Sequence, residues 1–128
     1  MKFVFIDTNI LVYLTYRESK FHHLCLLKFS ELSLQDFVFY IAPQIIKEYG
    51  RLLTSSKMFY KEIQHNISIF LSGMKLLEET ESTISEFVNL LHFYNVNGKS
   101  VYDCNIAAVI KDYRVKNILT HNVQDFGR

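Results

Sequence analysis

The chain has 128 residues, of which 49% are hydrophobic and 21% are charged, and its formal net charge is +1. This size predicts one domain with its own buried core, and the high apolar content excludes an intrinsically disordered chain. The small net charge excludes nucleic-acid binding driven by overall charge, so any basic surface must be local.

Short apolar runs with strand-like composition alternate with segments of helical periodicity along the whole chain. The predicted strands cover 2–6, 37–41 and 117–120. The predicted helices cover 9–16, 21–34, 43–54, 57–73, 81–95 and 100–114. For residues 75–78, a short strand and a helix end remain equally open.

Local signals support these boundaries. Asp7 or Thr8 can cap the first helix, and Pro43 stands where a helix prefers its first residue. Alternating strands and helices predict the α/β class, as a three-layer α/β/α sandwich with a central parallel sheet. Folds of this kind often have one more edge strand, which is not evident before Arg128, so the final edge strand is expected to be missing.

The two cysteines, Cys25 and Cys104, have no metal-binding or redox spacing, which indicates buried free thiols in a reducing cytoplasm. No apolar run is long enough to span a membrane. The first apolar run is interrupted by Asp7, which a signal peptide would not allow. The sequence therefore predicts a cytoplasmic protein that forms one domain over residues 1–128, without a membrane segment.

Four carboxylates come from four separate segments, each near the carboxyl end of the expected sheet. Asp7 follows the first strand, Glu48 lies on the helix after the second, Asp103 begins the helix 100–114, and Asp125 follows the last strand. Ligands of open parallel sheets bind beyond the carboxyl ends of the strands. Taken singly, each acid is better explained as a cap, a solvated side chain or a turn residue; together they predict one site.

These acids are flanked by apolar residues, which indicates partial burial, and isolated carboxylates resist burial. Clustered carboxylates repel one another unless a cation compensates them, and a ligand set made only of oxygen suits Mg²⁺ or Mn²⁺. The histidines and cysteines share no zinc-ligand spacing. A cation held in this way can activate water for hydrolysis of a phosphodiester.

Three motifs, FIDTNILVY, VYDCNIAA and ILTHNVQDF, occur in this order, and KEYGRL lies between the first two. In these motifs the whole chain resembles PIN-domain ribonucleases, and in size it is similar to toxins of the VapC type. The resemblance implies a PIN-like fold in which Asp7, Glu48 and Asp103 are catalytic metal ligands. Asp125 matches a fourth acidic position that varies in the family.

The same resemblance implies supporting roles beside the acids. Asn9, Thr120 and Asn122 match polar positions expected to bind ligands, water or substrate phosphate. The family implies a Mg²⁺- or Mn²⁺-dependent endoribonuclease that acts on RNA. As a toxin of this type, the protein would form a homodimer and be neutralised by a small antitoxin protein, whereas some relatives act in RNA processing instead.

Two other classes of protein remain open. A phosphatase of the haloacid dehalogenase type also has an Asp after its first strand, but it needs an acid two residues later, where this chain has Asn9. A non-catalytic binding module would retain the fold, although the presence of all four acids disfavours it. Arg51, one helical turn from Glu48, could contact phosphate, pair with Glu48 or simply be solvated, and the solvated position is favoured.

Overall fold

A parallel sheet of four strands forms the centre of the computed structural model, which describes residues 2–94 and 100–120. The strand order is β3-β2-β1-β4. The strands are β1 (Lys2–Ile6), β2 (Phe37–Ile41), β3 (Lys75–Leu76) and β4 (Ile118–Leu119). The open segment 75–78 begins with strand β3 at Lys75–Leu76 and contains no helix end. Any strand formed by residues after 120 lies outside the described residues.

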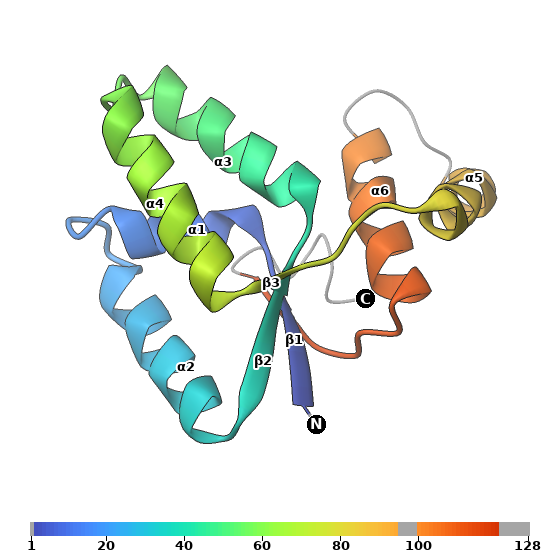
Figure 1. Cartoon of the computed structure of the whole chain (residues 1–128), viewed down its shortest axis with the longest axis horizontal. Helices are drawn as coiled ribbons and strands as arrows, with labels where there is room; N and C mark the ends of the chain where they lie inside the picture. The colour runs from blue at the N-terminus through green and yellow to red at the C-terminus, as the bar shows by residue number, and fades with distance from the viewer. Residues whose placement is uncertain (1, 95–99, 121–128) are drawn as a thin grey trace.

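Helices cover both faces of this sheet, which confirms the predicted three-layer α/β/α sandwich. Figure 1 shows α1 to α4 on one side of the strands and α5 and α6 on the other. The helices are α1 (Thr8–Thr15), α2 (His22–Leu34), α3 (Pro43–Ser55), α4 (Tyr60–Gly73), α5 (Glu81–Tyr94) and α6 (Ser100–Asp112). Over the described ranges, no helix is long and apolar enough to cross a membrane.

Strand β1 lies inside the sheet and anchors the core. It pairs in parallel with β2 on one side and with β4 on the other. Its residues Val4, Phe5 and Ile6 are at most 3% exposed. A strand covered by helices on both faces has to be apolar throughout, which explains the uninterrupted apolar run before Asp7.

Two helices end earlier or begin later than predicted because residues other than glycine adopt left-handed backbone conformations. Lys57 has φ 65°, and it ends α3 with hydrogen bonds from Lys57 N to Thr54 O and from Met58 N to Leu53 O. This arrangement is a helix-ending motif that normally uses glycine. The predicted start of the next helix at 57 is therefore wrong, and α4 begins at Tyr60. Arg114, with φ 57°, likewise ends α6 at Asp112 rather than at 114.

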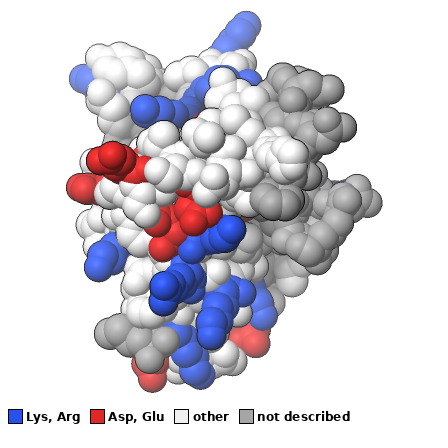
Figure 2. Space-filling view, turned by 90° about the vertical axis from the view of Figure 1, so that its right-hand side faces the viewer, with Lys and Arg blue, Asp and Glu red and all other residues white. Residues whose placement is uncertain are grey.

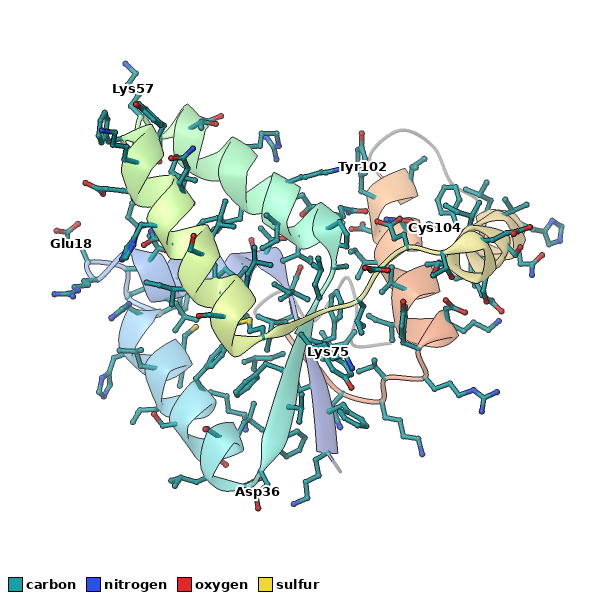
Figure 3. The ribbon with its side chains drawn as sticks, in the orientation of Figure 1. Glu18, Asp36, Lys57, Lys75, Tyr102 and Cys104 are labelled. Atoms are coloured by element: carbon teal, nitrogen blue, oxygen red, sulfur yellow. The ribbon has the colours of Figure 1, made fainter. Side chains whose placement is uncertain are left out.

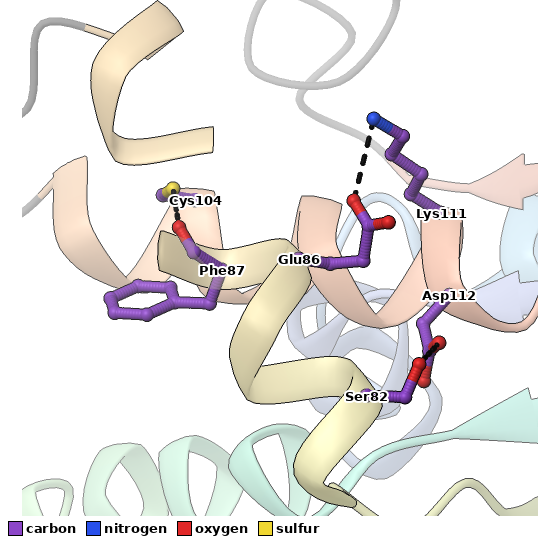
Figure 4. A network of polar contacts seen from close by, with 6 residues as sticks. All are labelled: Ser82, Glu86, Phe87, Cys104, Lys111 and Asp112. Carbon is purple, nitrogen blue, oxygen red and sulfur yellow. Dashed lines mark hydrogen bonds and ion pairs between the residues drawn. The ribbon is translucent and has the colours of Figure 1, made fainter. Parts of the chain in front are cut away.

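The thiols were predicted correctly as buried and free. Cys25 and Cys104 form no disulfide, and burial raises the pKa of each thiol above its ordinary value. The Cys104 Sγ lies 3.9 Å from the carbonyl oxygen of Phe87 and donates to it, at the contact between α6 and α5 (Figure 4). Cys104 therefore packs α6 against α5.

Polar contacts also join α5 to α6. The Asp112 carboxylate accepts hydrogen bonds from Ser82 Oγ at 2.5 Å and from Thr83 Oγ1 at 2.7 Å. Lys111 Nζ lies 3.3 Å from Glu86 Oε2 (Figure 4). Asp112, which helical periodicity places opposite Asp103, thus has a structural role away from the predicted site.

Asp112→Asn is expected to lower stability at neutral pH and to have no effect in strong acid. The hydrogen bonds from Ser82 and Thr83 lower the pKa of Asp112 below its ordinary value of 3.8. A lowered folded-state pKa stabilises the protein above the unfolded value, and this contribution disappears as pH falls through the folded value. Because the group is largely solvated, we expect a loss of about 1 kcal/mol or less. Urea unfolding of the variant and the parent at about pH 7 and about pH 2.5 measures the difference in the free energy of unfolding. An equal difference at both pH values would contradict the stabilising role of the ionised Asp112.

Candidate active site

A polar cavity of about 230 Å³ lies beyond the carboxyl end of β1, where α1, α3 and α6 meet. Its lining residues are Asp7, Thr8, Asn9, Glu48, Arg51, Leu52, Asp103 and Ile106. Three of the four predicted acids therefore line one cavity, although they are separated by up to 96 positions in the sequence (103 − 7). Ligand sites of parallel sheets are expected at this edge.

Asp7 is held at the end of β1 by hydrogen bonds to both carboxylate oxygens. Its Oδ1 accepts from the backbone N–H of Thr8 at 2.8 Å and so caps α1, as the sequence indicated. Its Oδ2 accepts from Thr120 Oγ1 at 2.8 Å. The backbone N–H of Asp7 donates to Leu119 O at 3.1 Å, which joins the residue to β4. Asp7 is thus rigidly placed with only 8% exposure.

The electrostatics of the cavity disfavour an ionised Asp7. Burial is the largest cause that raises its pKa above the ordinary value of 3.8, and the negative charges of Glu48 and Asp103 raise it further. The hydrogen bonds from Thr120 and Thr8 act in the opposite direction. A bound cation stabilises the ionised form of carboxylates that are buried close to other negative charges.

Glu48 reaches the same cavity from the second turn of α3, which Pro43 begins in its first position. The Glu48 Oε2 accepts a hydrogen bond from Thr8 Oγ1 at 2.9 Å. The Glu48 Oε1 accepts from Gln44 Nε2, one helical turn earlier, at 2.5 Å. Neutral donors on both oxygens therefore fix this carboxylate beside Asp7.

Of the other residues predicted for the site, three lie at or beside the cavity and two lie outside the described residues. Asp103 lines the cavity from the first turn of α6 and is exposed, and Asn9 lines it from α1. Thr120 contacts the site through its hydrogen bond to Asp7. Asp125 and Asn122 lie outside the described residues.

Sequence reasoning assigned no site role to Thr8 or Gln44, and for Arg51 it favoured a solvated position over a contact with phosphate or with Glu48. Thr8 was interpreted as a helix start, yet its hydroxyl binds Glu48. Gln44 lies four residues before Glu48, and this helical spacing could have identified it. Arg51 lines the cavity, and none of the ion pairs among the described residues includes it. Its predicted alternative, a salt bridge to Glu48, is therefore not formed.

The donor chemistry of the cavity fits a hard divalent cation. Carboxylates of Asp7, Glu48 and Asp103 face one space with hydroxyl and amide groups beside them. Within 2–94 and 100–120, no three acidic, histidine or cysteine side chains converge closely enough to form a complete ligand set. Mg²⁺ commonly binds through one or two carboxylates and keeps several waters, which suits an open set of this kind.

The fold and the cavity together define an α/β protein with an acidic site at the carboxyl edge of its parallel sheet. The model of the PIN domain family matches residues 4–127, so the chain belongs to the PIN domain family. No curated protein sequence matches the chain significantly. Membership of the PIN domain family rules out the alternative class, a phosphatase of the haloacid dehalogenase type.

Solved structures with the same fold include several toxin–antitoxin proteins. The chain is similar to VapBC2 of Rickettsia felis, bound to a DNA fragment from the promoter, with 21% identity and a TM-score of 0.72 over 98% of this chain and 92% of that one. It is also similar to Mycobacterium tuberculosis VapC20, a sarcin–ricin loop cleaving toxin, with 14% identity and a TM-score of 0.74 over 97% of this chain and 93% of that one. VapBC-1 of nontypeable Haemophilus influenzae is similar with 19% identity and a TM-score of 0.70 over 98% of this chain and 90% of that one. At these identities the likeness establishes the fold alone.

Proposed function

We propose that this protein is a Mg²⁺- or Mn²⁺-dependent endoribonuclease and the toxin of a VapBC-type toxin–antitoxin pair. The observation that carries the proposal is the meeting of Asp7, Glu48 and Asp103 in one cavity of a PIN domain. Asp125 is proposed as a further acidic member of the site, and Asn122 as a polar residue that supports it. A divalent cation bound there supplies charge stabilisation at the phosphate and activation of water.

The residues of the chain have distinct tasks in this proposal. Asp7, held by Thr8 and Thr120, presents a fixed carboxylate to the cation. Glu48 contributes a carboxylate from α3, and Asp103 contributes one from α6, to a site that leaves room for waters on the cation. Asn9 is placed to hydrogen-bond a water molecule or a phosphate oxygen.

RNA is the proposed substrate, and Arg51 supports the binding of its phosphodiester backbone. An acidic cavity repels a phosphodiester unless positive charge is available nearby. Arg51 lines the cavity together with the acids and presents a guanidinium that suits phosphate oxygens. We therefore propose that Arg51 contacts the substrate backbone, in place of the solvated role that sequence reasoning favoured.

Mg²⁺ and Mn²⁺ are expected to stabilise the protein against heat. A cation bound only by the folded state with a dissociation constant of about 1 mM adds about 1.4 kcal/mol at about 10 mM. For a domain of this size, the melting temperature then rises by roughly 5 °C. Calorimetry and thermal unfolding measure both quantities, with NaCl at matched ionic strength as the control. If neither cation binds in the millimolar range, the result favours the non-catalytic binding module.

An antitoxin partner and a homodimer are proposed from the kinship with VapBC complexes. Light scattering with size-exclusion chromatography distinguishes a 15.1 kDa monomer from a dimer. Induced expression is expected to arrest growth, and coexpression of a small protein encoded beside the gene is expected to relieve the arrest. RNA cleavage without growth arrest would identify an RNA-processing nuclease that is not a toxin.

A further inference from the structure

A hydrogen-bonded chain of side-chain amides joins α3 to α6 and ends on Glu48, which lines the cavity. Gln44 Nε2 donates to Glu48 Oε1 at 2.5 Å within α3. The same nitrogen donates to the backbone carbonyl of Tyr102 at 3.1 Å across to α6. Asn105 Nδ2 donates to Gln44 Oε1 at 2.6 Å, also across this interface. Figure 3 places Tyr102 at the N-terminal end of α6, near the first turn of α3.

This pattern fixes the orientation of the Gln44 amide. A primary amide has two N–H donors on nitrogen, and its oxygen only accepts. Both donors of Gln44 are used, one on a carboxylate and one on a carbonyl, and its oxygen receives the Asn105 amide. A flipped Gln44 would place oxygen against two acceptors and nitrogen against a donor. The Glu48 carboxylate and the Tyr102 carbonyl can only accept, so they fix this orientation, and the Asn105 amide donates to the Gln44 oxygen on the other side.

Glu48 is constrained from two sides as a result. Thr8 Oγ1 donates to its Oε2, and Gln44 Nε2 donates to its Oε1. Each carboxylate oxygen has a second lone pair that these two hydrogen bonds leave unused. Because Gln44 is uncharged, it orients the carboxylate without the competing charge that Lys or Arg would bring.

We propose that Gln44, supported by Asn105, is a positioning residue that holds Glu48 for cation binding and couples it to the first turn of α6, which carries Asp103. This inference rests on the proposed function and adds to it a role for two residues outside the acidic set. Groups that orient metal-binding carboxylates typically contribute 10–100-fold to metal affinity or activity.

The test compares Gln44→Ala and Asn105→Ala with the parent protein. For Gln44→Ala we expect the affinity for Mn²⁺ and Mg²⁺, measured by calorimetry, to fall by about tenfold or more. Cleavage of RNA should need correspondingly more metal and should recover toward the parent rate at saturating metal, because Glu48 is still present. Asn105→Ala should have a smaller effect of the same kind. The double variant should equal Gln44→Ala, because Asn105 acts through Gln44.

Gln64→Ala is the matched control, since Gln64 is an exposed glutamine on another helix, α4. It should leave metal affinity and cleavage unchanged. If Gln44→Ala lowers thermal stability but leaves metal affinity at the parent value, the amide chain merely ties two helices together and the inference is wrong. If the parent binds neither cation and cleaves no RNA, the proposed function fails, and the inference with it.

Discussion

Asp7→Asn is expected to lower the rate of RNA cleavage by at least about 100-fold while the fold is retained. Asparagine removes the negative charge but preserves the shape of the side chain. Its Oδ1 can still accept from Thr8 N, and its Nδ2 can donate to Thr120 Oγ1, which now accepts. Single-turnover cleavage at saturating metal measures the activity, and circular dichroism with thermal unfolding verifies the fold.

Asp36→Asn provides the matched control for this substitution. Asp36 is exposed in the turn before β2, at the opposite end of the strand from the cavity (Figure 3). Its backbone has φ 64°, a conformation that asparagine tolerates well. This variant should cleave RNA at the parent rate. If Asp7→Asn also cleaves within about threefold of the parent, the assignment of the active site is wrong.

Asp7, Glu48 and Asp103 could be brought together from the sequence because the carboxyl ends of strands in a parallel sheet meet at one edge. Glu48 and Asp103 lie on helices that follow recognisable signals, and Asp7 ends the most apolar strand. For Asp7, the structural and the functional interpretations are both compatible with the geometry. One carboxylate oxygen caps α1, and the other carries the contact with Thr120.

The supporting contacts could not be found in this way, because they depend on how the helices pack. Gln44 and Asn105 are 61 residues apart and meet only when α3 and α6 flank the cavity. Lys57 and Arg114 delay the start of α4 and end α6 early, and these boundaries escaped prediction for a local reason. Both residues adopt positive φ, a conformation that sequence reasoning reserves for glycine and asparagine.

Phe5→Ala is expected to cost about 3–5 kcal/mol in the free energy of unfolding. Phe5 is fully buried in β1, two residues before Asp7. Its backbone N–H donates to Asn117 O at 2.9 Å, so the strand cannot easily move into the space left by the ring. Loss of the ring removes its hydrophobic transfer free energy, and the void left in the core removes van der Waals contacts of the surrounding side chains. Urea unfolding followed by circular dichroism measures the difference.

A loss of this size is a large part of the 5–15 kcal/mol that typically stabilises a domain. Because β1 carries Asp7 at its end, the activity of Phe5→Ala should fall with the folded fraction rather than with metal affinity. Phe59→Ala, at a ring that is 56% exposed, should cost less than about 1 kcal/mol. A cost for Phe5→Ala as small as that of Phe59→Ala would mean that β1 is not the packed centre on which the cavity is built.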